Sequence, residues 1–168
     1  ITTTGFGYGD TVQWPLFSQV ILLLLMCLGG SAGSTAGGFK VIRAIIIGRI
    51  AKNQILSTLS PNRVLTMHIN GAVLDKDTQH KVLKYLAVYI LIIAALIFII
   101  SLDNNNLMTV TSAVISCFNN IGPMIGTTET FSIYSPFSKF LLSLAMIAGR
   151  LEIYPILLLF LPRTWSNR

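Results

Sequence analysis

One stretch near the start of the sequence has the residue types of a loop that binds cations through its backbone. It reads TTTGFGYGD and covers residues 2–10. Selectivity filters of this kind strip water from an ion and replace it with backbone carbonyl oxygens. A glycine at the turn supplies backbone conformations that other residues adopt only at a cost. The stretch therefore predicts a carbonyl-lined cation filter, which needs membrane helices to hold it.

The composition is that of a membrane protein. Hydrophobic residues make up 53% of the chain and charged residues 11%, against about 25% charged in average globular proteins. The net charge of +6 is concentrated, because eight of the twelve Lys and Arg residues lie between Lys40 and Lys84. A basic block between apolar segments indicates a cytoplasmic loop under the positive-inside rule. Without aromatic or recognition-helix context, it does not indicate nucleic-acid binding.

Three long apolar segments follow one another along the chain. Tyr85–Leu102 is uncharged and long enough to cross a bilayer, and Phe140–Leu161 is a second span that carries Arg150. The third begins at Trp14 and meets GGSAGSTAGG at Gly29–Gly38, after which helix resumes at Phe39. Because glycine disfavours helix, this sequence predicts a transmembrane helix interrupted at depth, which is tolerated only beside protein or a water-filled cavity.

A shorter apolar segment, Leu107–Phe118, has too few residues to cross the membrane. It is followed by NNIGPMIG, a polar turn sequence from Asn119 to Gly126. The two together predict a re-entrant pore helix with a returning loop. In the basic segment, Val64–Ile69 and Ala72–Leu74 flank Asn70-Gly71, which favours a β-hairpin. We therefore expect an all-α membrane protein with helix–pore-loop–helix repeats and one small cytoplasmic hairpin.

If successive apolar segments cross the membrane in opposite directions, the basic segment 40–84 and the C-terminus lie on one side of it. Asp10, Asp103 and Glu129 then lie on the other, where an acidic mouth would concentrate cations. Spacing indicates an internal repeat as well. Gly5 to Gly33 and Gly122 to Arg150 are both 28 residues apart, so Arg150 is expected level with the glycine-rich break. Cys27 and Cys117 are too isolated for a disulfide or metal site, and His68 and His80 lack ligand partners.

The chain resembles the bacterial TrkH/KtrB potassium-uptake subunits of the Trk/Ktr/HKT superfamily. The matching motifs are TTTGFGYGD, GGSAGSTAGGFKVIR at Gly29–Arg43, NNIGPMIG and GRLEIY at Gly149–Tyr154. The resemblance covers nearly the whole chain. Members of that family are single chains of four repeats around one pore. The resemblance implies that residues 1–50 hold the filter and interrupted inner helix of repeat three, residues 51–84 a cytoplasmic loop, and residues 85–168 the complete repeat four.

The resemblance also implies which residues do what. Potassium, the transported ligand, is expected at filter residues Thr3, Thr4, Gly5, Asn120, Ile121 and Gly122. The gate is expected at Gly29, Gly30, Gly33, Ser34, Gly37, Gly38 and Arg150. No bound cofactor and no enzymatic activity are implied. The expected location is the bacterial inner membrane, and the expected partners are lipid, the first two repeats, a second copy in a homodimer and cytoplasmic nucleotide-binding regulatory subunits.

The sequence departs from the family at Met124, where members usually have glycine, and this departure concerns the loop beyond the second filter.

Other interpretations fit less of the sequence. A subunit of a tetrameric or two-pore-domain potassium channel would explain the first loop, but not the broken helix. A nucleotide-binding P-loop at Gly33–Lys40 fails on spacing. A membrane scaffold would explain glycines through close helix packing, but not two polar loops at pore-loop positions.

Overall fold

The computed structural model describes residues 3–5, 11–31, 37–59, 68–69, 72–73, 75–103, 105–126 and 130–151. Five α-helices dominate them, in chain order α1 (Leu16–Leu28), α2 (Val41–Leu59), α3 (Lys76–Ile100), α4 (Leu107–Phe118) and α5 (Pro136–Arg150). Short 3-10 turns precede α1 (η1, Thr11–Gln13) and α5 (η3, Phe131–Ile133) and follow α3 (η2, Ser101–Asp103). The all-helical prediction is confirmed.

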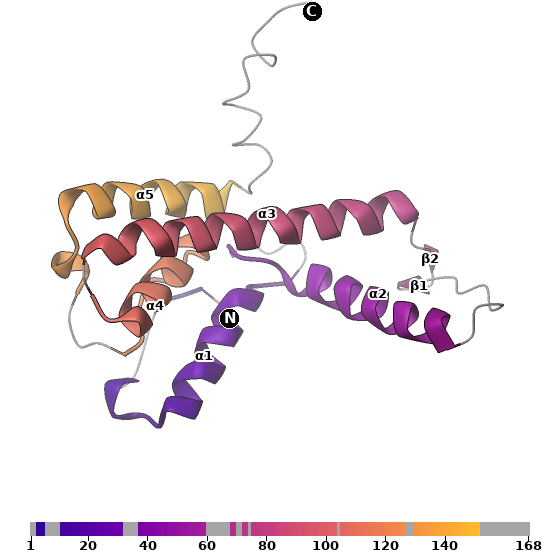
Figure 1. Cartoon of the computed structure of the whole chain (residues 1–168), viewed down its shortest axis with the longest axis horizontal. Helices are drawn as coiled ribbons and strands as arrows, with labels where there is room; N and C mark the ends of the chain where they lie inside the picture. Colours follow the sequence, from indigo (N-terminus) through magenta and orange to yellow (C-terminus); the bar gives the residue numbers. More distant parts are fainter. Residues whose placement is uncertain are drawn as a thin grey trace, which may run out of the picture.

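The longest helix, α3, contacts α2, α4 and α5. The described segment Asp77–Asp103 is long and apolar enough to cross a membrane, whereas α1 and α4 are apolar but short. Figure 1 shows α5 and α4 beside the C-terminal half of α3 and α2 beside its N-terminal half. The predicted span Tyr85–Leu102 lies mostly within α3, but the helix begins earlier, at Lys76, because polar residues end a span without ending a helix.

The segment predicted as a cytoplasmic loop therefore contains helix at both ends, since α2 continues to Leu59 and α3 begins at Lys76. Between them, β1 (His68–Ile69) and β2 (Ala72–Val73) pair antiparallel, with Ile69 opposite Ala72. This is the register that the predicted hairpin requires. Residues 64–67, 70–71 and 74 of that hairpin lie outside the described residues.

The interrupted helix is observed as two helices. The first, α1, ends at Leu28, and α2 begins at Val41 rather than at Phe39. Lys40 has a φ of 68°, in the left-handed region, so the helix cannot begin before it. The two sides of the break are joined by a hydrogen bond from the Val41 N–H to the Gly30 carbonyl (3.1 Å). Residues 32–36, which include Gly33 and Ser34, lie outside the described residues.

The core forms around α4, where nine of twelve residues are buried. Its apolar face packs against α3 and α5, with Ile100, Val110, Val114 and Phe118 almost completely enclosed. Phe39 continues this core past the break, its ring 5.5 Å from that of Tyr89 on α3. A short helix with most of its residues buried holds the loop that follows it, because the helix cannot move without disturbing the core.

The start of α5 is defined by its cap. Ser135 occupies the N-cap and its hydroxyl accepts from the Ser138 N–H (3.2 Å), with Pro136 at the first helical position. The Ser135 N–H in turn donates to the Asp103 carboxylate (3.1 Å) at the end of η2. The helix α5 therefore begins four residues before the predicted span Phe140–Leu161, because Ser-Pro is a helix-start signal that hydropathy does not register. Residues 152–168 lie outside the described residues.

Candidate functional site

The two predicted filter segments lie against each other. A Cβ atom placed on Gly5 would be 3.0 Å from the Ile121 carbonyl oxygen, and one placed on Gly122 would be 3.7 Å from the Gly5 Cα. Residues 117 positions apart in the sequence are thus brought into backbone contact. Residues 6–10, the rest of the first motif, lie outside the described residues.

Both segments have the same alternation of backbone hand. In the first, Thr3 (φ 54°) and Gly5 (φ 75°) are left-handed and Thr4 between them is not. In the second, Asn120 (φ 56°) and Gly122 (φ 108°) are left-handed and Ile121 is not. A β-branched residue such as Thr3 is rarely found at positive φ, and such outliers concentrate at functional sites. Two independent loops therefore share an uncommon backbone pattern at the predicted positions.

The second loop is held by two serines of α4. The Ser116 hydroxyl accepts from the Gly122 N–H (3.0 Å). One turn earlier, the Ser112 hydroxyl accepts from the Ile125 N–H (3.1 Å) and lies 2.9 Å from the Ile125 carbonyl. The loop therefore runs back along the helix that precedes it, as the pore-helix prediction requires. Neither serine is among the predicted site residues. Two serines four residues apart lie on one face of an apolar helix, and this spacing indicates a polar contact made by that face.

The end of α4 is packed against the glycine-rich break. A Cβ on Gly37 would lie 2.6 Å from the Asn119 carbonyl oxygen, and one on Gly29 would lie 2.6 Å from the Gly37 carbonyl oxygen. Gly29 (φ 65°) and Gly38 (φ 92°) are also left-handed. Side chains larger than glycine do not fit at this junction, where Gly37 and Gly38 contact Asn119 and Gly29 packs behind them against Gly37 and Gly38.

On its other side, the end of α4 is packed against α5. A Cβ on Gly149 would overlap the Phe118 carbonyl oxygen, and the Asn120 side chain donates to the Met146 carbonyl (3.1 Å). Arg150, the last residue of α5, is exposed among the described residues and follows Gly149 directly. Gly37 and Gly149 thus contact neighbouring residues of one turn, one on each side.

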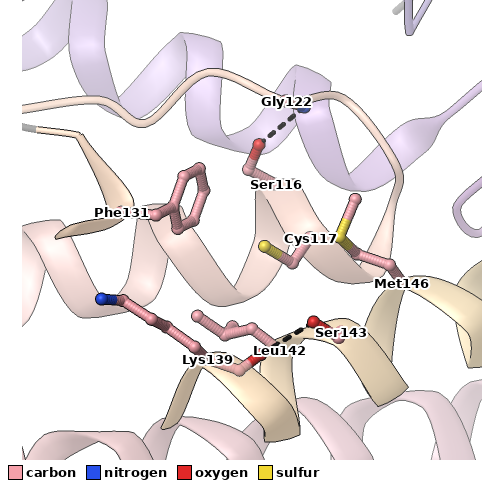
Figure 2. Close-up of a pocket in the computed structure, with 8 residues that line it drawn as sticks. All are labelled: Ser116, Cys117, Gly122, Phe131, Lys139, Leu142, Ser143 and Met146. Carbon is pink, nitrogen blue, oxygen red and sulfur yellow. Dashed lines mark hydrogen bonds between the residues drawn. The ribbon is translucent and has the colours of Figure 1, made fainter. Parts of the chain in front are cut away.

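A cavity of about 220 Å³ lies between α4 and α5 behind the second filter loop. Figure 2 shows Cys117 of α4 facing Leu142 and Met146 of α5 across it, with the Ser116–Gly122 hydrogen bond at its edge. Its lining is mostly apolar. In the described residues, no group of three or more His, Cys, Asp or Glu side chains could hold a metal ion.

The short helix α4 is largely buried, the loop after it returns along it, and the loop at Thr3–Gly5 contacts that returning loop. This is the arrangement that the sequence predicts for two neighbouring pore loops. The chain belongs to the TrkH family of cation transport proteins, whose family model matches residues 1–167. This is a family of transporters and not of enzymes.

Individual relatives agree with the family match. The chain is 31% identical over 167 residues to the Trk system potassium uptake protein TrkH of Escherichia coli (strain K12), covering 99% of this chain and 35% of that protein. It is 32% identical to TrkH of Vibrio parahaemolyticus, covering 99% of this chain and 34% of that protein. The crystal structure of the potassium transporter TrkH from Vibrio parahaemolyticus aligns with a TM-score of 0.89 at 31% identity, covering 98% of this chain and 36% of that one. The chain thus spans about a third of the length of its relatives.

Proposed function

We propose that this chain is the C-terminal part of the pore-forming subunit of a Trk-type potassium uptake system. The observation that carries the proposal is the shared left-handed alternation at Thr3–Gly5 and Asn120–Gly122 in two loops that touch. A positive φ at every second residue gives both loops the same uncommon backbone path, and filters of this kind coordinate ions through backbone carbonyls. Dehydrated potassium would pass between the carbonyls of these two loops and those of two further repeats.

The gate in this proposal consists of the glycine-rich break and Arg150. Support comes from the contacts of Gly37 with Asn119 and of Gly149 with Phe118, which put both candidate gate elements beside one turn of the pore loop. A fixed positive charge at that level would oppose cation passage, and an arginine at membrane depth usually marks function. Glycines keep the opposing loop free to adopt more than one backbone conformation.

The remaining parts of the proposal concern the whole protein. The segments 1–50 and 85–168 would be the end of repeat three and the whole of repeat four. The basic segment 40–84 and the C-terminus would face the cytoplasm from a bacterial inner membrane. There the basic segment would meet anionic lipid or nucleotide-binding regulatory subunits, and the assembly would be a homodimer. The charge asymmetry of the sequence supports this orientation.

Ion selectivity tests the proposal. The complete transporter, reconstituted in lipid vesicles, should carry potassium in preference to sodium. Gly5→Ser and Gly122→Ser should each lower the potassium-to-sodium flux ratio by about tenfold, because a left-handed backbone costs a residue with a Cβ about 1–2 kcal/mol. Gly48→Ser is the matched control, since nothing lies within 4 Å of a Cβ at Gly48. Arg150→Ala should raise the basal flux in the same vesicles. An unchanged flux ratio in both filter variants would disprove the filter assignment.

A further inference from the structure

The side-chain amide of Asn119 joins three elements at the base of the second filter loop. Asn119 follows the last residue of α4 and has no exposed surface. Its Oδ1 accepts a hydrogen bond from the Tyr89 hydroxyl of α3 (2.9 Å). Its Nδ2 donates to the Met26 carbonyl of α1 (2.9 Å). One side chain therefore connects the pore helix with the outer helix of its own repeat and with the inner helix before the break.

The orientation of this amide follows from its partners. A backbone carbonyl can only accept, so the Met26 carbonyl must face the amide nitrogen, and the amide oxygen must face Tyr89. Met26 lies in the last turn of α1, where carbonyl groups have no partner within the helix. The Tyr89 hydroxyl then acts as donor, and its ring is fixed by contacts with Phe39 and Phe118. These partners therefore support one orientation of the Asn119 side-chain amide.

The Asn119 side-chain amide also lies where the glycine-rich break meets the second filter loop. The Asn119 carbonyl and side chain touch Gly37 and Gly38 of the break, and the next residue, Asn120, begins the left-handed stretch of the filter. A shift of Gly37 or Gly38 toward α4 would displace Asn119, because Gly37 packs against its carbonyl oxygen and Gly38 against its side chain. A shift of Asn119 is passed directly to Asn120 and Gly122.

We propose that Asn119 is a positioning residue that couples the inner-helix break to the second filter loop, and that Tyr89 holds it in the coupling orientation. The proposal rests on the function proposed above and adds a regulatory connection within it. With the break in its present conformation, the Tyr89–Asn119–Met26 contacts keep the filter backbone in its selective geometry. When the break moves, the same contacts carry the movement into the filter.

The test compares two buried tyrosines that each donate to α4 or its end. Tyr89→Phe removes the hydrogen bond to Asn119, and Tyr134→Phe removes a hydrogen bond to the Thr109 carbonyl (3.2 Å) at the other end of the same helix. Both variants keep the ring and lose one buried hydroxyl contact. In vesicles holding the complete transporter, Tyr89→Phe should lower the potassium-to-sodium flux ratio by roughly three- to tenfold, the effect of one lost hydrogen bond. Tyr134→Phe should leave the ratio unchanged.

A second measurement separates coupling from stability. In an Asn119→Ala background, Tyr89→Phe should have no further effect on the flux ratio, because Tyr89 acts only through the amide. Equal ratios for the two tyrosine variants, or additive effects of Tyr89→Phe and Asn119→Ala, would overturn the coupling and leave the transport function standing. Wild-type vesicles without potassium-selective flux would instead overturn the proposed function, and this inference with it.

Discussion

At Gly149 of α5 the position of a missing methyl group is occupied by another part of the backbone. A Cβ there would overlap the carbonyl oxygen of Phe118 and would lie 3.1 Å from the side-chain Nδ2 of Asn120. Gly48 of α2 is the opposite case, an exposed glycine inside a helix with nothing within 4 Å of its Cβ position. The two glycines cost their helices the same propensity, but only Gly149 is required by a neighbour.

This difference predicts opposite effects of one substitution. Gly149→Ala should lower the free energy of unfolding by about 1–3 kcal/mol, because α5 must move away from the pore helix. Gly48→Ala should raise it by up to about 1 kcal/mol, since alanine is the better helix former. Thermal unfolding of the complete transporter in detergent measures both. Midpoints that shift in the same direction would contradict the close contact at Gly149.

The hydrogen bond between Tyr89 and Asn119 could not be predicted from the sequence. The pattern NNIGP predicts a turn after a helix, and Asn119 is in that turn. Its partners, however, are 30 and 93 residues away, and no local periodicity relates them. Tyr89 is indistinguishable in sequence from the other aromatic residues of an apolar span. Only the packing of α1, α3 and α4 around one amide reveals the connection.

At the scale of elements, α4 and the loop that returns along it form one hydrogen-bonded unit. Successive turns of α4 present Ser112 and Ser116, which bind the loop at Ile125 and Gly122 respectively. The Ile121 N–H adds a bond to the Ser116 carbonyl (2.9 Å). The loop thus obtains its conformation from a helix face, because each serine satisfies a backbone group that has no strand or helix partner.

Removing one of these serines should loosen the loop. Ser112→Ala leaves the Ile125 N–H buried without its acceptor, which costs about 1–3 kcal/mol of unfolding free energy. Ser143→Ala on α5 is the control, because that exposed hydroxyl bonds only to the Lys139 carbonyl of its own helix (2.9 Å). It should change stability by about 0.5 kcal/mol or less. Denaturant or thermal titration in detergent compares them, and equal losses would contradict a structural role for Ser112.

Element boundaries were predictable where the local signal was strong. Leu107–Phe118 was expected as a short helix and α4 has those two residues as its ends, since the apolar run stops abruptly at two asparagines. The start of α3 was placed nine residues late, at Tyr85 rather than Lys76. Hydropathy identifies the part of a helix that can lie in hydrocarbon, whereas helix itself continues through charged residues that favour it.

At the scale of the whole molecule, large apolar side chains remain uncovered on several helices. Phe17 and Leu24 of α1 are 76% and 60% exposed, and Phe98 of α3 is 76% exposed. On α5, exposed residues recur along one face at Phe137, Phe140, Leu144 and Ile147. Patches of this extent need an apolar surrounding. A lipid bilayer and the repeats of a full-length family member would supply it, in line with the proposed function.

The proposed orientation predicts which side of the membrane each end of α3 faces. His80 and Asn106 are both exposed and flank the apolar part of the helix. In intact cells, with Cys27 and Cys117 replaced by alanine, an impermeant maleimide should label Asn106→Cys directly. It should label His80→Cys only after the membrane is opened, because the part of α3 beyond His80, about 30 Å long, separates the two positions. Labelling of both positions in intact cells would contradict a membrane-spanning α3.

The two-sided packing of the pore-helix end also has a consequence for how the protein is made. The turn at Asn119 and Asn120 is contacted by Gly37, synthesised long before it, and by Met146 and Gly149, synthesised after it. A nascent chain released before residue 146 would contain every predicted filter residue of this segment and yet lack the contacts that α5 makes with the turn. Because chains emerge from the ribosome N-terminus first, this turn can make its contacts with α5 only after α5 itself has been synthesised. The contacts around Asn119 and Asn120 are therefore added in the order of synthesis, first from Gly37 and last from Gly149.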